Sequence, residues 1–175
     1  ELSDGSALYF NDVRQFGYWK AVPRAELEKH HAHLGPEPLT KDFTLAGLRV
    51  ALARRKRTSI KAALLDQTVV AGIGNIYADD SLFAARIKPA EKVSQLTQAE
   101  IATLYGSIRK VLTKAVKARG TSFNSYRDGL GRKGTYWERR LAYGRVGEPC
   151  PRCGMLFKKT VVAQRGTTYC SKCQK

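Results

Sequence analysis

Apolar residues recur at helical spacing over two stretches in the middle of the chain. The clearer stretch follows Thr97, and its apolar face comprises Ile101, Leu104, Tyr105, Ile108, Val111, Leu112, Ala115 and Val116. Thr97 and Glu100 have the spacing of a capping box, and Gly120 provides a stop signal. We therefore predict a long amphipathic helix between Thr97 and Gly120 that supplies a hydrophobic core.

The other stretch, between Thr44 and Pro89, indicates helices separated by a glycine turn. A helix is expected from Thr44 through Leu52 into the cationic run 54–57. This run is interpreted as a solvated helix end with a secondary role in the electrostatic footprint of the molecule.

Gly72 and Gly74 allow a sharp turn before the next helix, and Asn75 is suited to cap that helix. Asp79 and Asp80 are expected in its first turn. The unpaired N–H groups of such a helix start can bind a phosphate. The alternative is a packed helical hairpin in which the glycines only allow two backbones to approach.

Apolar and β-favouring residues near the two ends of the chain predict short strands. Residues 1–22 are expected to form two half-buried strands around a turn at residues 11–12. Two strands alone are marginal in water, so this segment is interpreted as the last hairpin of a larger sheet. Near the other end, residues 158–163 and 167–169 flank a predicted hairpin turn at 164–166.

All the cysteines of the chain lie in this last part: Cys150, Cys153, Cys170 and Cys173. Two Cys-x2-Cys pairs in a chain without secretory features indicate zinc rather than disulfides. Four thiolates complete a tetrahedral shell, so we predict one structural Zn²⁺ in a ribbon with no open position for catalysis. His30, His31 and His33 have no acidic or Cys partner nearby and are interpreted as solvated residues at a helix end.

The charge of the chain indicates a polyanionic partner. Its 31 Lys and Arg against 15 Asp and Glu give a net charge of +16. DNA, RNA and an anionic membrane all fit, and nucleic acid is favoured because no basic amphipathic terminal helix is evident. No apolar stretch approaches the ~20 residues of a membrane span, and the polar start is unlike a signal peptide, so we expect a cytoplasmic protein.

Four motifs together resemble a known family. AGIGNIYADDSLF, preceded by IKAALLDQ, resembles the helix-two-turns-helix motif of the formamidopyrimidine-DNA glycosylase and endonuclease VIII family of DNA repair enzymes. DVRQFG resembles a strand-loop of that family, TSFNSYRDGLGRKGTY its lesion loop, and YGRVGEPCPRCG with AQRGTTYCSKCQ its zinc finger. DVRQFG, AGIGNIYADD and GRVGEPCPRCG are more similar to formamidopyrimidine-DNA glycosylase than to endonuclease VIII.

This resemblance implies damaged double-stranded DNA as the partner. It assigns DNA-binding roles to Lys61, Gly74, Asn75, Arg165, Arg14 and Phe16. In the family, the residue at Lys61 contacts the phosphates of the flipped nucleotide, and the residue at Arg165 contacts the phosphate beside the lesion. The residues at Arg14 and Phe16 enter the duplex, where a cation and an aromatic wedge offset part of the unstacking cost. The loop over residues 121–136 would close over the lesion, or alternatively be an ordinary glycine-rich linker.

The resemblance also implies a bifunctional glycosylase and AP lyase that removes oxidised purines such as 8-oxoguanine and formamidopyrimidines. The family nucleophile is an N-terminal Pro followed by Glu, whereas this chain begins Glu1-Leu2-Ser3, so no catalytic residue is assigned here. We therefore expect the monomeric, damaged-DNA-binding part of a bacterial, nucleoid-associated enzyme, inactive alone. The alternatives are a non-catalytic damage-binding protein, an endonuclease VIII-like glycosylase acting on oxidised pyrimidines, and an RNA-associated zinc-ribbon protein.

The predicted fold class is mainly α with small β parts. We expect a β-sandwich remnant and linker at 1–36, and a helix-two-turns-helix DNA-binding domain at 37–143 that includes the loop at about 121–136. A four-cysteine zinc finger is expected at 144–175.

Overall fold

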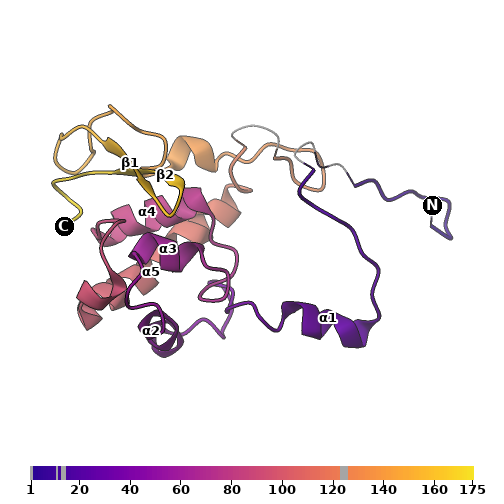
Figure 1. Cartoon of the computed structure of the whole chain (residues 1–175). Helices are drawn as coiled ribbons and strands as arrows, with labels where there is room; N and C mark the ends of the chain where they lie inside the picture. The colour runs from indigo at the N-terminus through magenta and orange to yellow at the C-terminus, as the bar shows by residue number, and fades with distance from the viewer. Residues whose placement is uncertain (1, 11, 13–14, 123–125) are drawn as a thin grey trace. The chain divides into compact units, whose positions relative to one another are not determined.

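The structure is a computed structural model that describes residues 2–10, 12, 15–122 and 126–175. The chain separates into two units, Glu1–His33 and Leu34–Lys175. Among the described residues, the larger unit holds every helix and strand except the first helix (Figure 1). The predicted fold class is confirmed, because the larger unit is mainly helical with one small antiparallel hairpin.

The smaller unit contains one helix, α1 (Arg24–His31), which has no buried residue. The described residues of segment 1–22 form no strand, contrary to the prediction, and Phe16 and Tyr18 are 80% and 82% exposed. The physical reason is that two strands need a third strand or a helix on which to bury their apolar face. Arg14 lies outside the described residues.

The described part of the larger unit is built on four α-helices with two short 3₁₀ turns between and after them. Its helical elements are α2 (Leu45–Ala53), α3 (Ile60–Leu65), α4 (Asn75–Ala85), η1 (Val93–Gln95), α5 (Gln98–Lys117) and η2 (Tyr136–Arg139). In the described ranges, no helix is long and apolar enough to cross a membrane.

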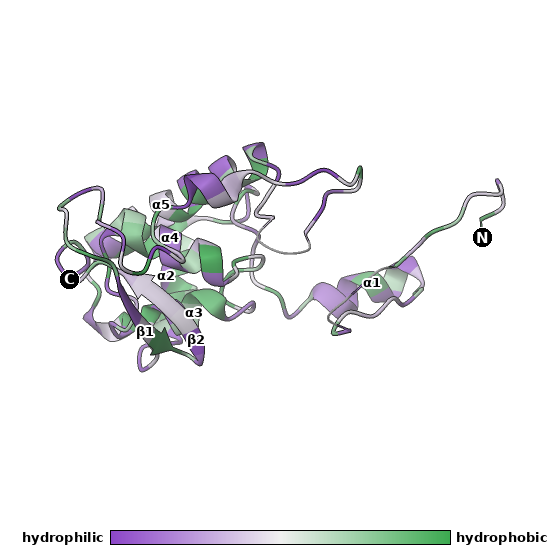
Figure 2. Ribbon diagram, turned by 90° about the horizontal axis from the view of Figure 1, so that it is seen from above, coloured by the Kyte–Doolittle hydropathy of each residue, from purple (hydrophilic) through white to green (hydrophobic). Residues whose placement is uncertain are grey.

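The helices share one apolar core that matches the predicted periodicity except at Val116, which is 65% exposed. Among its fully buried members are Leu52, Ile60, Leu64, Leu82, Leu104 and Ile108. Figure 2 shows the apolar residues gathered on α2 and α3, whereas the strands of the hairpin are mostly hydrophilic. The predicted capping box of α5 is confirmed, since the Thr97 hydroxyl accepts from the Glu100 N–H at 3.2 Å and Glu100 Oε2 accepts from the Thr97 N–H at 2.7 Å.

Helix α4 differs from its prediction at two points. Its N-cap is Gly74, whose carbonyl accepts from the Ala78 N–H at 2.9 Å, and Asn75 is the first helical residue rather than the cap. Asp79 and Asp80 lie beyond the first turn and are fully buried. Their carboxylates therefore serve tertiary contacts and do not complement the helix dipole from solvent.

Asp80 fastens the segment that connects α5 to the C-terminal module. Its carboxylate accepts from the Tyr136 hydroxyl at 2.8 Å and from the N–H groups of Leu141, Ala142 and Tyr143 at 2.9, 2.8 and 3.0 Å. A buried carboxylate with four donors is well satisfied, so this anchor fixes where the C-terminal module begins.

The C-terminal module is a two-stranded antiparallel hairpin of β1 (Lys158–Val162) and β2 (Arg165–Tyr169). Val162 pairs with Arg165, so the turn is Ala163-Gln164, which starts one residue earlier than predicted and is one residue shorter, and Arg165 is the first residue of β2. Ala163 and Gln164 have φ of 51° and 58°. Both values belong to the two-residue turn whose twist matches that of the flanking strands.

The four cysteines of the module are close enough to share one metal ion. Their Sγ atoms all lie within 4.8 Å of one another, with Cys150–Cys173 at 3.9 Å and Cys153–Cys170 at 3.5 Å. Zn–S bonds of about 2.3 Å in a tetrahedron place sulfur atoms roughly 3.8 Å apart. The four thiols therefore fit a structural zinc ion.

Replacing Asp80 by Asn should lower the free energy of unfolding by about 3 kcal/mol, because an amide cannot accept all four hydrogen bonds of a buried carboxylate. Urea unfolding followed by circular dichroism measures the change. Asp42→Asn, at an exposed position, is the matched control and should stay within about 0.5 kcal/mol of the wild type. Equal stabilities of the two variants would contradict the anchoring role.

Replacing Cys170 by Ser should release the metal and unfold the C-terminal module, because so small a hairpin has little core apart from its metal. The helical signal should persist, since α2 to α5 share their own core. Metal analysis and far-UV circular dichroism measure the two effects, with the neighbouring Ser171→Ala as control. Stoichiometric zinc in the Cys170 variant would exclude the four-thiolate site.

Candidate nucleic-acid interface

Lys61 of α3 is fully buried beneath the hairpin. Its ammonium lies 2.6 Å from Asp79 Oδ1, 2.7 Å from Thr167 Oγ1 and 3.2 Å from the Gly166 carbonyl oxygen. An ammonium has three N–H donors, and here each has an acceptor. In this structure the Lys61 ammonium therefore contacts α4 and β2 and is not exposed at the surface, and its phosphate contact stays a prediction.

Burial dominates the electrostatics of this ion pair. It lowers the pKa of Lys61, and it raises the pKa of Asp79 to about 6 although the Lys61 ammonium acts in the opposite direction. The second Asp79 oxygen accepts from the Thr168 N–H at 2.8 Å. Asp79 thus binds α3 through Lys61 and β2 through the Thr168 backbone.

The start of α4 lies directly against the hairpin. Asn75 Nδ2 donates to the Gly166 carbonyl at 3.0 Å, and this amide carries a second N–H that can donate to an anion. The backbone N–H groups of Asn75, Ile76 and Tyr77 precede the first intrahelical donor, Ala78. Donors of this kind at a helix start are suited to binding an anion, and Asn75 is hydrogen-bonded to the strand that carries Arg165.

Gly74 leaves open space in front of this helix start. Its φ of −102° requires no glycine, and a Cβ built there would meet no atom of the described chain within 4 Å. By contrast, Gly72 has a φ of +80°, which favours glycine for conformational reasons. A glycine needed neither for φ nor for internal packing is consistent with close approach of a ligand to the backbone.

Arg165 is exposed at the start of β2. Side chains alternate along a strand, so Arg165 and the buried Thr167 share one face of the hairpin. Thr167 contacts Lys61, and the charge of Arg165 is close enough to lower the Lys61 pKa further. Arg165 therefore lies on the side of the hairpin that faces α3 and the start of α4.

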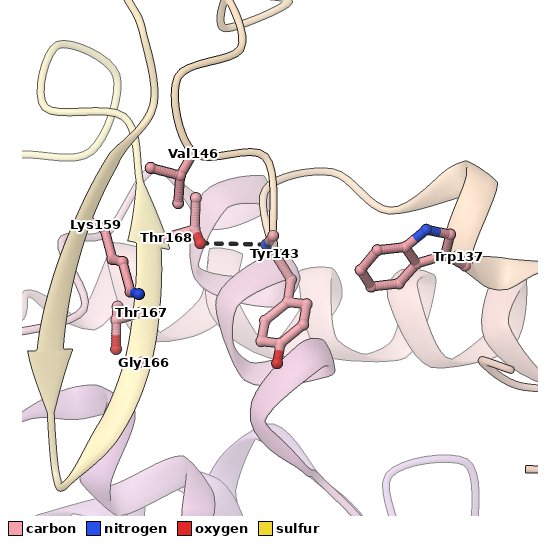
Figure 3. Close-up of a pocket in the computed structure, with 8 residues that line it drawn as sticks. Trp137, Tyr143, Val146, Lys159, Gly166, Thr167 and Thr168 are labelled. Atoms are coloured by element: carbon pink, nitrogen blue, oxygen red, sulfur yellow. Dashed lines mark hydrogen bonds between the residues drawn. The ribbon is translucent and has the colours of Figure 1, made fainter. Parts of the chain in front are cut away.

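An open cavity of about 510 Å³ adjoins this strand. It is lined by Trp137, Tyr143, Gly144, Val146, Lys159, Gly166, Thr167 and Thr168. Figure 3 shows Trp137 and Tyr143 on one side of it and the strands on the other, joined where the Gly144 N–H donates to Thr168 Oγ1 at 3.2 Å. Aromatic rings and an ammonium beside the proposed anion site are typical of nucleic-acid-binding surfaces.

The structure brings together four of the predicted DNA-binding residues: Lys61, Gly74, Asn75 and Arg165. Phe16 belongs to the other unit. Sequence reasoning missed Asp79, Thr167 and Thr168 as parts of this assembly. The available signal was the acidic pair inside an otherwise apolar helix, because a buried carboxylate requires partners.

Hydrogen bonds join the two ends of segment 121–136 to each other. Thr121 pairs with Thr135, and Ser122 Oγ accepts from the Gly134 N–H at 2.8 Å. Farther out, Arg132 forms an ion pair with Asp128 at 2.8 Å. These contacts fix the two ends of the segment beside one another.

Two family models match the larger unit. The formamidopyrimidine-DNA glycosylase H2TH domain matches residues 34–126, and the zinc finger found in FPG and IleRS matches residues 147–175. The second match includes all four clustered cysteines, so the module holds one structural zinc.

Curated relatives match nearly the whole chain. It is 50% identical over 175 residues to the formamidopyrimidine-DNA glycosylase of Symbiobacterium thermophilum, covering 99% of the chain and 57% of the relative. The enzyme of Chloroflexus aurantiacus is 47% identical over 174 residues, with 99% and 62% covered. The chain thus spans about three fifths of the length of these relatives.

Solved structures show the same fold. The MutM (Fpg) protein from Thermus thermophilus has a TM-score of 0.77 and 44% identity, with 82% of this chain and 54% of that chain covered. Lactococcus lactis Fpg in complex with abasic-site DNA has a TM-score of 0.87 and 40% identity, with 94% and 60% covered. The H2TH match alone spans more than half of the 175 residues, so the chain belongs to the formamidopyrimidine-DNA glycosylase family.

Proposed function

We propose that this chain is the damaged-DNA-binding part of a bifunctional DNA glycosylase and AP lyase that removes oxidised purines in base-excision repair. Two lines of support come from the relatives, which are named formamidopyrimidine-DNA glycosylases, and from Lactococcus lactis Fpg structures with Fapy-dG and abasic-site DNA. The net charge of +16 provides the electrostatic attraction that a DNA backbone requires.

The observation that carries the proposal is the hydrogen bond between Asn75 Nδ2 and the Gly166 carbonyl. It joins the N-terminus of α4 to the residue that follows Arg165. Amide donors and a guanidinium held this close together can bind neighbouring phosphates of one strand. In this account Gly74 allows the backbone to approach DNA, Asn75 donates to one phosphate and Arg165 to the next.

The amine of Lys61 is unsuited to nucleophilic attack in this arrangement. It is buried, and its donors are engaged by Asp79, Thr167 and Gly166. We therefore assign no excision chemistry to the interface, and the proposed reaction requires groups that this interface does not provide. By resemblance, Arg14 and Phe16 remain the residues proposed to enter the duplex.

The same proposal places the protein at the nucleoid in a bacterial cytoplasm, acting as a monomer. A monomer is sufficient because one copy of the hairpin and one helix start supply both proposed phosphate contacts. The similarity to formamidopyrimidine-DNA glycosylases favours oxidised purines over oxidised pyrimidines as substrates.

Replacing Arg165 by Ala should weaken binding of an abasic duplex by at least about tenfold, because a charged hydrogen bond to phosphate is lost. The slope of log K against log salt should fall by about 0.9, which corresponds to one phosphate. Fluorescence anisotropy over a salt series measures both quantities. Lys110→Ala is a matched control, because Lys110 lines a hollow with Ala84 and Arg152 at the opposite end of α4. Equal slopes for Arg165→Ala and the wild type would show that Arg165 faces away from DNA.

The 175-residue chain should bind duplex containing an abasic site or 8-oxoguanine without excising the base. Excision is measured on a labelled 8-oxoguanine duplex, which is incubated with excess chain, treated with alkali to cleave any abasic site formed, and analysed on a gel. A full-length relative such as the Symbiobacterium thermophilum enzyme serves as the positive control. Base release by this chain would contradict the assignment of a purely DNA-binding role to its interface.

A further inference from the structure

Lys61 and Asp79 contact three successive residues near the start of β2, and one of these residues in turn binds the Arg165 carbonyl. Lys61 donates to the Gly166 carbonyl and to Thr167 Oγ1 at 3.2 and 2.7 Å, and the Thr167 hydroxyl donates to the Arg165 carbonyl at 3.0 Å. Asp79 accepts from the Thr168 N–H at 2.8 Å. One buried ion pair thus holds residues 166–168 directly, and holds Arg165 through the Thr167 hydroxyl.

This ion pair crosses a long span of sequence. Lys61 and Thr167 are 106 positions apart, and Asp79 and Thr168 are 89 apart. The side chains of both charged residues are 0% exposed. The zinc site, through Cys170 and Cys173, fixes the end of the hairpin opposite its turn. The Lys61–Asp79 pair holds the end near the turn, which carries Arg165.

Stability alone does not account for charges at this place. Desolvation of a buried pair offsets most of its attraction, and well-packed apolar residues of similar volume often give equal or greater stability. Apolar residues cannot supply directional contacts. Only hydrogen bonds fix the positions of a carbonyl, a hydroxyl and an N–H group of one strand. The pair is therefore better explained by placement of the strand than by strength.

We propose that Lys61 and Asp79 are positioning residues that hold the start of β2 against α4, so that Arg165 and Asn75 meet phosphates of the same DNA strand. This inference rests on the proposed DNA-binding function. In it Lys61 makes no contact with DNA and affects affinity only through Arg165. The prediction from the family resemblance, a direct phosphate contact by Lys61, is the competing account.

The test is a double-mutant cycle between the pair and Arg165. The first variant is Lys61→Met with Asp79→Leu, which removes both charges and leaves no unpaired charge in the interior. Fluorescence anisotropy with an abasic duplex over a salt series measures affinity and salt slope for this variant, for Arg165→Ala and for their combination. Zinc content and helical circular dichroism are measured on each protein.

Positioning through Arg165 predicts a non-additive cycle. The charge-free variant should lose about as much affinity as Arg165→Ala, within about twofold, and should have the same reduced salt slope. In the Arg165→Ala background the same change should have less than about twofold further effect. Additive losses, with a salt slope reduced by a further ~0.9, would show that Lys61 contacts phosphate directly and would overturn the proposal.

Thr167→Val provides a second variant that leaves both charges and the volume of the side chain in place. It removes the hydroxyl that links Lys61 to the Arg165 carbonyl. Its affinity should fall in the wild-type background and remain unchanged in the Arg165→Ala background. Wild-type affinity of this variant and of the charge-free variant would overturn the inference.

The failures of the two proposals are distinguishable. If Arg165→Ala weakens binding but the charge-free variant and Thr167→Val do not, DNA binding through Arg165 stands and the positioning role is wrong. If Arg165→Ala binds DNA as the wild type does, both the proposed function of this hairpin and the positioning role are overturned.

Discussion

The buried contact between the Lys61 ammonium and the Asp79 carboxylate is the interaction on which the candidate interface depends. It joins α3, α4 and β2 at one point, with an N–O distance of 2.6 Å and no exposure of either side chain. Charges removed from water are costly unless every donor and acceptor is matched, and here Thr167, Gly166 and Thr168 supply the remaining partners. The hairpin can adopt few other positions without leaving one of these groups unsatisfied.

Three sets of contacts stabilise the C-terminal module, which is too small to fold on a hydrophobic core of its own. Asp80 secures the entrance to the module through three consecutive backbone N–H groups, the four thiolates close its far end around zinc, and Asp79 holds the start of β2. Asp79 and Asp80 are adjacent on α4, and Asp79 binds the hairpin of the module whereas Asp80 binds the segment that leads into it. Helix α4 therefore both provides the helix start proposed to bind phosphate and supports the module that carries Arg165.

Much of this arrangement could be predicted from the sequence, and the rest could not for identifiable reasons. The α5 face, its capping box and the zinc ligands follow from spacing alone, because they involve residues near one another in the chain. The predictions that Asn75 caps α4 and that Asp79 lies in its first turn were wrong. Both side chains form hydrogen bonds with a hairpin about 90 residues away in sequence, which local capping rules cannot detect. The strands predicted in residues 1–22 are absent from the described part of that segment, since a strand pattern does not supply the surface on which strands pack.

The central claim is that the start of α4 and the metal-supported hairpin bind neighbouring phosphates of one damaged strand. A crystal structure of the 175-residue chain with a duplex containing an abasic site tests it most directly. The account predicts the Asn75 amide and the Arg165 guanidinium on adjacent phosphates of the same strand, with the Lys61 ammonium still buried between Asp79 and Thr167. Asn75 and Arg165 directed to opposite sides of the molecule, or Lys61 turned outward onto a phosphate, would contradict it.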